Sequence, residues 1–594
     1  MTQARRRDDG AEHSPQVPTQ TPRDVYAALA LPYVPRLLHL IDRNPFSRTY
    51  GCFDRAFWHY RTMDFPCGMS QEFVLVLALV ASRQYPGNRY FGVERIRELA
   101  EAAVRFIPRS SHKDGTTDDY FPFERAMGAL VFSLYAAAES YQLLGMRDAE
   151  VVECFSKRVK HLEMENETGR LSNHQALAAL AAYTVYEITG NPAHKKVADD
   201  RTELTLSWQN LSEGWFQEYE GADPGYHTCT IDFLGKLMKK RKDTSLVGPL
   251  RKAVDFAWNF MHADGSYGGE YGSRNTFHFY PHGFELMAPH TEKAGQIADA
   301  FLAGSRNGKR YINDDDRMTA HYVYDFLQAH DDYVSVRPGP IEEDRRDAKT
   351  LWMPAAKIAV HFGGDAADGL HVVANLSKGG VIKVFDRQGP IASDTGIIGQ
   401  LAGGAVVVSH LVDNHAAPVE SLDQPSAPVF SVKAHLSRRK HTLPTPFTSI
   451  VFRIGMITLG RFNANLVRSA LQKILITGKP HTPYEVERTI RFGSGRVVVE
   501  DRLPRDLVFA RLAVGSDATS IYVANSNVYQ ESVLCRWQFA DAASLPIENG
   551  LRVWRRTYFR GSGHGPGLHT DAMATPSCPP HHSPVAPIAS AAPQ

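Results

Sequence analysis

The sequence LSNHQALAALAAYTVYEITG, residues 171–190, is the stretch that decides the fold. Its apolar residues recur at helical spacing, and its alanines and leucines favour a helix. Ser172 with Gln175 three residues later has the form of a capping box, which predicts that Asn173 and His174 lie in the first helical turn. Similar helical segments, separated by short stretches containing Gly, Pro, Asn or Asp, recur throughout residues 23–340.

These helical segments predict an all-α first domain. They include residues 71–83, 93–106, 126–144, 149–164, 174–189, 246–260 and 292–302, and a helix at 230–241 is expected after the loop 215–227. Roughly a dozen helices are expected in this half. The alternation of short and longer loops suits helical hairpins that are packed as a solenoid or as a closed ring.

The pattern changes near residue 345, after the charged linker IEEDRRD at residues 341–347. Residues 348–560 form short segments rich in Val and Ile and bounded by turn residues, which predicts strands. The expected strands are 370–376, 380–386, 405–410, 429–434, 449–454, 484–492, 495–501 and 520–524. We therefore expect an antiparallel β-sandwich in which one face of each sheet is buried.

Composition places limits on location and partners. The 594 residues contain 66 Lys and Arg against 65 Asp and Glu, so no overall basic excess indicates nucleic acid. The apolar run 73–81 is too short to span a bilayer. The charged N-terminus does not resemble a secretory signal, which predicts a cytoplasmic protein as written, or a periplasmic or secreted one if the start site is misassigned. Residues 1–22 and 561–594 lack apolar periodicity and are predicted to be disordered.

Asn173 and His174 are the first candidate site residues. Free backbone N–H groups at a helix start favour an anion, and an amide and an imidazole placed there can bind a carboxylate. The alternative is that Asn and His are merely tolerated at a helix start.

Two loops are unusually rich in aromatic and charged residues. The first, 215–227, runs from Trp215 through Glu218 and Asp223 to Tyr226 and His227. The second, 264–285, is rich in Gly and contains Tyr271, Arg274, Asn275 and His278. Arginine can clamp a carboxylate in bidentate fashion, and functional residues are often carried on loops. Aromatic residues that only plug the domain are the alternative.

Weaker candidates lie elsewhere. Trp58 and Tyr60 belong to an aromatic segment that could line a saccharide site or simply pack. The carboxylate pairs Glu218 with Asp223 and Asp264 with Glu270 could serve a glycosidase. The histidines of the second half show no ligand motif; they are His410, His415, His435, His441 and His481. No cofactor is expected, and a divalent metal in the β-domain is left open.

Taken together, these motifs resemble those of the heparinase II/III-like polysaccharide lyases and the related alginate lyases, over about residues 40–560. The resemblance implies an (α/α) toroid over 23–340 and an antiparallel β-sandwich over 348–560. Asn173-His174 resembles the family's Asn-His pair, and Tyr226 lies where the family has its catalytic tyrosine. The segment 54–66 resembles a subgroup associated with bacterial exopolysaccharide loci, in place of the usual glycosaminoglycan substrates.

The resemblance implies β-elimination at a uronic acid of an acidic polysaccharide. Asn173, aided by Arg274, would neutralise the C6 carboxylate. His174 or Tyr226 would remove the C5 proton, and Tyr226 would protonate the departing glycosidic oxygen. A tyrosine that acts as a base needs positive neighbours, for which the candidates are His174, His227 and Arg274. The residues expected to contact the polymer are Trp58, Tyr60, Trp215, His227, Tyr271, Arg274, Asn275 and His278.

Two other functions remain open at this stage. A uronyl C5-epimerase needs the same proton abstraction but returns a proton to the opposite face without cleaving the chain. A polysaccharide-binding or assembly protein would bind the polymer without exchange or cleavage. A hydrolase is less favoured. The identity of the polymer, endo or exo action and the oligomeric state are left open.

Overall fold

The computed structural model describes residues 21–559 with interruptions at 165–168, 313, 316, 338–347, 365–368, 387–388, 413–418, 422–427, 440–442, 473–477, 479, 494, 518–528 and 530–533. The linker 341–347, the expected strand 520–524, the tail 561–594, His415 and His441 lie outside the described residues, as does most of segment 1–22. The first helix already begins at Pro22, where Thr21 caps it.

The first half is helical, as predicted. Its α-helices are α1 (Pro22–Ala30), α2 (Val34–Leu40), α3 (Arg55–Trp58), α4 (Val74–Ser82), α5 (Glu94–Phe106), α6 (Met127–Leu143), α7 (Ala149–Met164), α8 (Ser172–Thr189), α9 (Pro192–Ser207), α10 (Pro224–Arg241), α11 (Val247–Trp258), α12 (His282–Met287), α13 (Glu292–Arg306) and α14 (Thr319–Asp331). Shorter elements are the 3-10 turns η1 (Leu31–Tyr33), η2 (Met69–Phe73) and η3 (Pro108–Ser110), and the strands β1 (Gln217–Glu218) and β2 (Gly221–Ala222).

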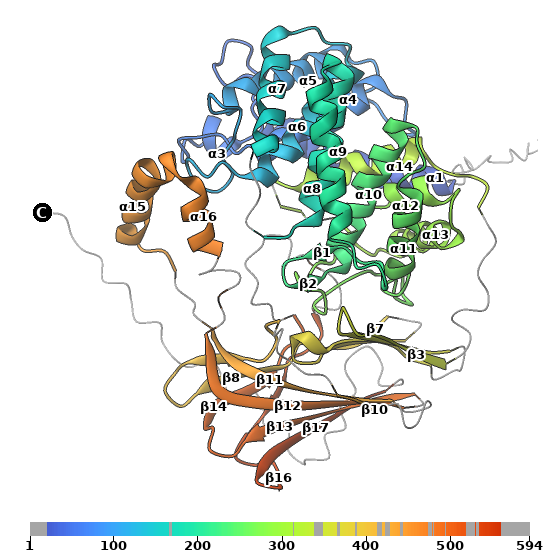
Figure 1. Ribbon diagram of the computed structural model, residues 1–594, viewed down its shortest axis with the longest axis vertical. Helices are drawn as coiled ribbons and strands as arrows, with labels where there is room; N and C mark the ends of the chain where they lie inside the picture. The colour runs from blue at the N-terminus through green and yellow to red at the C-terminus, as the bar shows by residue number, and fades with distance from the viewer. Residues whose placement is uncertain are drawn as a thin grey trace, which may run out of the picture.

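The even-numbered helices from α4 to α14 form a closed inner ring (Figure 1). Each packs on the next, and α14 returns to contact α4. The outer layer is made by α5, α7, α9, α11 and α13, each packed against the inner ring. Inner helices such as α4 and α10 are buried almost along their whole length, whereas α5 buries one face only. The chain therefore forms an (α/α) toroid rather than an open solenoid.

The inner helices share one direction, because an outer helix returns the chain after each of them. Their N-termini therefore collect at one end of the ring. Figure 1 shows this end, near β1 and β2, facing the sheets. Helix N-termini carry free N–H groups and partial positive charge, so this end favours anionic groups.

The second half consists of two antiparallel sheets. The five-stranded sheet has the order β3-β4-β5-β6-β7, and the ten-stranded sheet has the order β15-β14-β8-β9-β11-β12-β13-β17-β16 with β10 paired to β11. The strands of the first sheet are β3 (Ala348–Met353), β4 (Ile358–Gly363), β5 (His371–Asn375), β6 (Val381–Phe385) and β7 (Pro390–Asp394). Those of the second are β8 (Ile397–Leu401), β9 (Val406–Val408), β10 (Val419–Ser421), β11 (Val429–Arg439), β12 (His481–Gly493), β13 (Arg496–Pro504), β14 (Phe509–Val514), β15 (Gln538–Ala540), β16 (Ile547–Glu548) and β17 (Leu551–Phe559).

The five-stranded sheet is covered on both faces, which corrects the expectation of one buried face per sheet. Val372 and Val384 pack against the ten-stranded sheet, in a core shared with Phe430 and Ile490. Other residues of the same sheet, such as Val360, belong to the core of the helical domain. The architecture therefore has three layers, with the toroid resting on one sheet and that sheet resting on the other.

The expected strand 449–454 is a helix. Residues Pro446–Gly455 form α15, which continues through the π-helical turn η5 (Met456–Gly460) toward α16 (Ala464–Gln472). The β-branched run suggested a strand, but Thr445 caps the helix through the N–H of Thr448, and Pro446 occupies its first position. Among the described residues, no helix is long and apolar enough to cross a membrane.

Candidate active site

Asn173 and His174 lie in the first turn of α8, as predicted, but Ser172 and Gln175 do not form a capping box. The Ser172 hydroxyl instead donates to the carbonyl oxygen of Gln217, at 2.7 Å. Glu218 of β1 takes over the capping role, because its Oε1 accepts from the backbone N–H of Asn173 at 3.2 Å and from the Asn173 side-chain amide at 2.7 Å. A side chain distant in sequence therefore satisfies the helix start.

Glu218 joins two of the candidate residues. While Oε1 accepts from Asn173, Oε2 pairs with Nη1 of Arg274 at 2.9 Å. All three side chains are buried, and burial raises the pKa of Glu218 although Arg274 and Asn173 oppose that rise. Sequence reasoning considered Glu218 only as a glycosidase carboxylate and missed this bridging position. The strands β1 and β2, which place Glu218 beside α8, are too short to give a strand signal.

Tyr226 lies in the first turn of α10, not in a loop before it, because the helix begins at Pro224 and not at the expected residue 230. Asp223 caps the helix, with its Oδ1 accepting from the N–H of Tyr226 at 3.1 Å. An Asp followed by Pro is a recognisable helix start, so the sequence contained the signal for this boundary.

Asp223 also holds the loop 264–281 against α10. Its Oδ2 accepts from the backbone N–H of Arg274 at 2.6 Å, and its Oδ1 accepts from the Thr276 hydroxyl. Thr276 lies directly against Gly225, where a Cβ would collide with it. The absence of a side chain at Gly225 therefore permits the close approach that brings Arg274 to the start of α10.

The centre of the site is a stack of three side chains. The Arg274 guanidinium lies 3.5 Å from the ring centroid of Tyr226, and the His278 ring meets the Tyr226 ring edge-on at 4.6 Å. The far side of His278 is held by Tyr322 of α14, whose Oη is 3.1 Å from Nδ1 of His278. The structure thus brings Asn173, Tyr226, Arg274 and His278 together.

Arg274 and His278 at this centre differ in charge. Burial alone would lower the pKa of Arg274, but Tyr226 and Glu218 raise it above its ordinary value, so the guanidinium stays charged. Burial lowers the pKa of His278 well below its ordinary value, and His321 and Arg274 lower it further. His278 is therefore a neutral imidazole at pH 7, and a cation–π pair adjoins it.

His174 belongs to the same end of the ring and remains partly exposed. Its ring lies against Gly128 at the start of α6 and edge-on to Phe132, with centroids 6.2 Å apart. Phe132 in turn contacts His321 at 4.9 Å, and His321 stacks on Tyr280 at 5.8 Å. A chain of ring contacts therefore runs from His174 through Phe132 and His321 to Tyr280.

Glu72, His321 and Tyr322 are residues that sequence reasoning missed. Nδ1 of His321 lies 3.0 Å from Oε1 of Glu72, and burial raises the pKa of that carboxyl group. Tyr324 donates to the other carboxylate oxygen at 3.5 Å. The run His321-Tyr322-Val323-Tyr324 within a helical segment was the available signal, since three polar rings in one turn exceed what a helix needs to pack.

The β-domain supports the site through Lys378. Its Nζ donates to the carbonyl oxygens of Glu270 and Gly272 at 2.5 and 2.8 Å and to the side chain of Asn275. Burial lowers the pKa of Lys378 to about 8. Asn275 adopts a left-handed backbone with φ of 56°. Asn275 therefore takes part in the contact between the loop and the β-domain, and its expected role in binding polymer stays a prediction.

Trp215, His227 and Tyr271 are held by the protein itself. Trp215 donates its indole N–H to Glu213 at 2.9 Å and packs in the core. Nε2 of His227 lies 2.8 Å from the carbonyl oxygen of Ala253, and Tyr271 is wholly buried with its hydroxyl 2.8 Å from His262. Their expected roles in binding polymer, and the role of His227 as a positive neighbour of Tyr226, stay predictions.

Trp58 and Tyr60 lie apart from the centre. Trp58 of α3 donates its indole N–H to the carbonyl oxygen of Leu40 at 2.9 Å, and Tyr60 is exposed with Arg55 over its ring. No contact links either residue to Tyr226 or Arg274 among the described part of the chain. Figure 1 shows α3 at the edge of the toroid.

The carboxylates of the two pairs considered for a glycosidase all make contacts within the protein. Asp223 has the cap and loop contacts already described, and Glu218 is bound to Asn173 and Arg274. In the second pair, Asp264 pairs with Lys309 at 2.9 Å and Glu270 with Lys383 at 3.0 Å. A glycosidase needs one carboxyl group able to donate a proton and one free to attack or activate water, which these arrangements do not favour.

Among the described residues, a buried group of possible metal ligands lies in the toroid. Asp232, His282 and Asp325 have ligand atoms within 4.8 Å of one another. The Lys236 ammonium group already lies between the two carboxylates, at 2.6 Å from Asp232 and 3.1 Å from Asp325. The residues therefore fit an internal ion-pair cluster better than a divalent cation.

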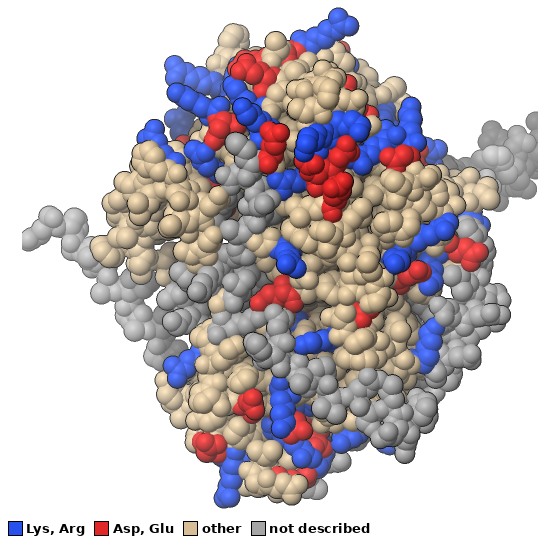
Figure 2. Space-filling model, in the orientation of Figure 1, with Lys and Arg blue, Asp and Glu red and all other residues tan. Residues whose placement is uncertain are grey.

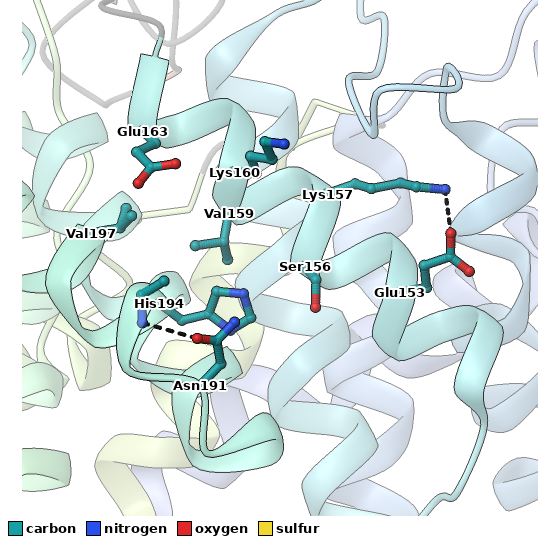
Figure 3. A pocket seen from close by; sticks show the side chains of 10 residues that line it. Glu153, Ser156, Lys157, Val159, Lys160, Glu163, Asn191, His194 and Val197 are labelled. Carbon is teal, nitrogen blue, oxygen red and sulfur yellow. Dashed lines mark hydrogen bonds and ion pairs between the residues drawn. The ribbon is translucent and has the colours of Figure 1, made fainter.

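A surface groove between α7 and α9 contains none of the site residues. Figure 3 shows its lining, in which Lys157 pairs with Glu153 at 2.7 Å and the imidazole of His194 lies beside Asn191. Its walls belong to the outer layer of the toroid. The groove is thus distinct from the end of the inner ring where Tyr226 lies.

The architecture resembles that of several polysaccharide lyases. A xanthan lyase from Paenibacillus is 8% identical with a TM-score of 0.48, and the alignment covers 83% of this chain and 46% of that one. Chondroitin AC lyase from Streptomyces coelicolor A3 is 11% identical, with a TM-score of 0.48 and coverage of 86% and 69%. Heparinase III is 11% identical, with a TM-score of 0.47 and coverage of 86% and 75%.

This chain therefore spans less than half the length of the xanthan lyase. A family 76 glycoside hydrolase and a cellobiose 2-epimerase align over 52% and 50% of this chain, with TM-scores of 0.36 and 0.38. No protein-family profile matches the sequence, and no curated protein matches it. Likenesses at such low identity concern the fold alone.

Proposed function

We propose that this protein is a polysaccharide lyase that cleaves a uronic-acid-containing polymer by β-elimination. The observation that carries the proposal is the contact between Arg274 and Tyr226, 3.5 Å from guanidinium carbon to ring centroid, at the end of the toroid where the inner helix N-termini collect. A cation over a tyrosine ring favours the phenolate form. This is what a tyrosine needs in order to accept or donate a proton near neutral pH.

The reaction begins with removal of the weakly acidic proton at C5 of the uronic acid. Negative charge then develops on the C6 carboxylate, so the site must stabilise it. Asn173 at the N-terminus of α8 supplies the amide and the partial positive charge of the helix end. Arg274 is paired with Glu218 and covered by Tyr226, so we assign it to stabilising the phenolate instead of clamping the substrate carboxylate.

Tyr226 and His174 are the acid–base groups in this proposal. His174 is partly exposed, and Tyr226 is buried with 7% of its surface accessible, against 4% for Arg274 and 0% for His278. Depending on the configuration at C5, either His174 or Tyr226 accepts the proton, and Tyr226 then donates a proton to the leaving glycosidic oxygen. The C4–O bond breaks as the C4–C5 double bond forms, which leaves an unsaturated uronate at the new non-reducing end.

The test is a panel of uronate polymers, including bacterial exopolysaccharides, in which the ultraviolet absorbance of the unsaturated product is followed. We expect absorbance to rise with at least one polymer and to be lost in Tyr226→Phe and His174→Ala. Tyr271→Phe is the matched control, because it removes a buried phenol hydroxyl that contacts His262 and not the site. Full activity in Tyr226→Phe would refute the assignment.

The same purified protein and polymers also distinguish the two alternative functions. Incorporation of solvent deuterium at C5 without cleavage would identify a C5-epimerase, which requires the same first step. Binding of polymer with neither exchange nor cleavage, and unaltered by Tyr226→Phe, would identify a binding or assembly protein.

A further inference from the structure

The helical insertion between β11 and β12 differs from the rest of the β-domain. Helix α15, the turn η5 and helix α16 stand beside the toroid, near α3 (Figure 1). Their contacts with the toroid lie on one side. Arg453 pairs with Asp64, Phe452 meets Phe121 edge-on at 5.3 Å, and the Arg461 guanidinium lies 5.8 Å from the centroid of Phe123.

The opposite side of the insertion is an exposed apolar stripe. Phe447, Ile450, Val451 and Ile454 occupy positions i, i+3, i+4 and i+7 of α15, and their exposed fractions are 74%, 59%, 52% and 57%. This spacing places all four on one helical face. Beyond α15, Ile457, Leu459, Phe462 and Leu466 are also exposed. We call these eight residues the apolar stripe.

The inner face of the same insertion is already packed. Met456, Gly460 and Ala464, spaced by four residues, are buried. The insertion therefore has one face that packs and a second apolar face that faces solvent. A contiguous exposed apolar surface of this kind marks an interaction site.

The charge of this region indicates the partner. Residues 438–484 contain no Asp or Glu, and their basic residues are Arg438, Arg439, Lys440, Arg453, Arg461, Arg468, Lys473 and Lys479. The chain as a whole has a formal net charge of +1, so this excess is local. Figure 2 shows the area of α15 and α16, at the left of the view, as a mostly tan surface.

We propose that the apolar stripe, together with basic residues of the segment 438–479 other than Arg453 and Arg461, docks the protein on an anionic lipid membrane surface. Basic residues together with an exposed apolar helical face are the features of helices that lie in the membrane interface. At 10 residues α15 is too short to cross a bilayer, so it lies in the interface plane. A second copy fits less well, because two such surfaces would bring like charges together without a compensating carboxylate.

The experiment is flotation of the purified full chain with lipid vesicles. One vesicle is phosphatidylcholine alone, and the other is phosphatidylcholine with phosphatidylglycerol. We expect flotation with the phosphatidylglycerol vesicles and little or none with phosphatidylcholine alone, and high salt should weaken it because exposed charges are screened.

Three variants sharpen the test. Ile450→Ser combined with Ile454→Ser should weaken vesicle binding at least about tenfold, because two buried aliphatic side chains are lost. Arg438→Gln, at an exposed position of β11 shortly before the insertion in the sequence, should weaken binding about fivefold, the effect of one charge near an anionic surface. Phe46→Ser is the matched control, since Phe46 is 95% exposed on the toroid and outside the stripe, and it should leave binding unchanged.

Circular dichroism and the thermal unfolding midpoint establish that each variant is folded. Absence of flotation with both vesicles, or equal flotation of the double variant, would overturn the proposal. So would a concentration-dependent dimer in sedimentation experiments without lipid that the double variant abolishes, because the occupant would then be a second copy. None of these outcomes depends on the polysaccharide activity.

Discussion

Arg274 shows how one side chain can set the chemistry of another. Its guanidinium is fixed on one side by Glu218 at 2.9 Å, while its planar face covers the ring of Tyr226 at 3.5 Å. A fixed cation costs no reorganisation when charge appears on the phenol, which is the condition for electrostatic catalysis. Lysine lacks the planar group that makes both contacts at once.

We therefore predict that Arg274→Gln lowers kcat about 100-fold, the usual cost of one preorganised stabilising group. Because the phenolate form of Tyr226 loses its cation, the acid limb of the pH–kcat profile should also move to higher pH. Steady-state rates measured across a pH series provide the check.

Arg337 offers a matched control for this substitution. The Arg337 guanidinium also lies over a tyrosine ring, that of Tyr333, at 4.9 Å, and it pairs with Glu285 at 2.7 Å. None of the contacts described for the site links Arg337 to Tyr226. Arg337→Gln should lower stability and leave the pH–kcat profile unmoved. An equal shift in both variants would contradict the role assigned to Arg274.

At the scale of elements, the site depends on how α10 and the loop 264–281 are joined. Asp223 caps the helix and at the same time accepts from the Arg274 N–H and the Thr276 hydroxyl. The helix start and the loop are therefore ordered by one carboxylate. Burial raises the pKa of Asp223, although these hydrogen bonds oppose the rise.

Asp223→Ala is predicted to lower the free energy of unfolding by about 3 kcal/mol, from a lost cap and buried donors left without an acceptor. It should also abolish activity, because Tyr226 and Arg274 lose their common support. Urea unfolding followed by circular dichroism measures the first effect. Asn191→Ala, which removes the side-chain cap of α9 through the Ala193 N–H, should cost only about 1 kcal/mol and spare activity.

A second prediction concerns the contact between the β-domain and the loop. Lys378→Met should lower kcat about tenfold with a smaller effect on KM, since displaced site residues lose rate before binding. Lys309→Met is the comparison, because Lys309 pairs with Asp264 near the other end of the same loop. A similar loss of kcat in both variants would indicate general loosening of the loop instead of positioning by Lys378.

At the scale of the whole molecule, the stability of both domains depends on neutral buried histidines. Burial lowers the pKa of His227 in the toroid to about 4, and burial likewise lowers the pKa of His361 in the five-stranded sheet to about 4. In the unfolded chain both would have a pKa near 6.5. The unfolded state therefore binds more protons between these two values.

The contribution of each neutral histidine to the free energy of unfolding is fully present above pH 6.5 and is lost as the pH falls toward 4. For each histidine the full loss is about 3 kcal/mol at most. We predict that the thermal unfolding midpoint falls steadily from pH 6.5 to 4.5, and that His227→Gln makes this dependence shallower. Calorimetry across the pH range tests both, and an unchanged slope in the variant would exclude His227 as a contributor.

Much of the architecture follows from local pattern. The apolar periodicity of residues such as 149–164 predicted α7 with its observed bounds, and the expected strands matched β5, β6, β9, β11, β12 and β13, while the other strands of the two sheets were not expected. Those signals are local because they arise from which side of a helix or strand must be buried. Asn173, Tyr226, Arg274 and His278 were also singled out, since polar and aromatic residues at helix starts and in glycine-rich loops exceed the needs of packing.

The remaining features were decided by contacts between distant residues. One exception is local: the stretch 449–454 has the composition of a strand, but the Thr445 cap and Pro446 at the first helical position favour a helix. Tyr271, His227 and Trp215 were expected to bind polymer, and only the tertiary structure shows that their side chains are buried. Glu218, Tyr322 and Lys378 became part of the site because the closed ring and the covered sheet bring them to Arg274, His278 and Asn275.

The sequence by itself therefore determined the two kinds of secondary structure, their order and the residues able to carry the chemistry. The tertiary structure alone decided which of those residues meet. The physical reason is that periodicity and capping depend on neighbours within a few residues, whereas burial, ion pairing and shifted pKa values depend on side chains brought from far along the chain.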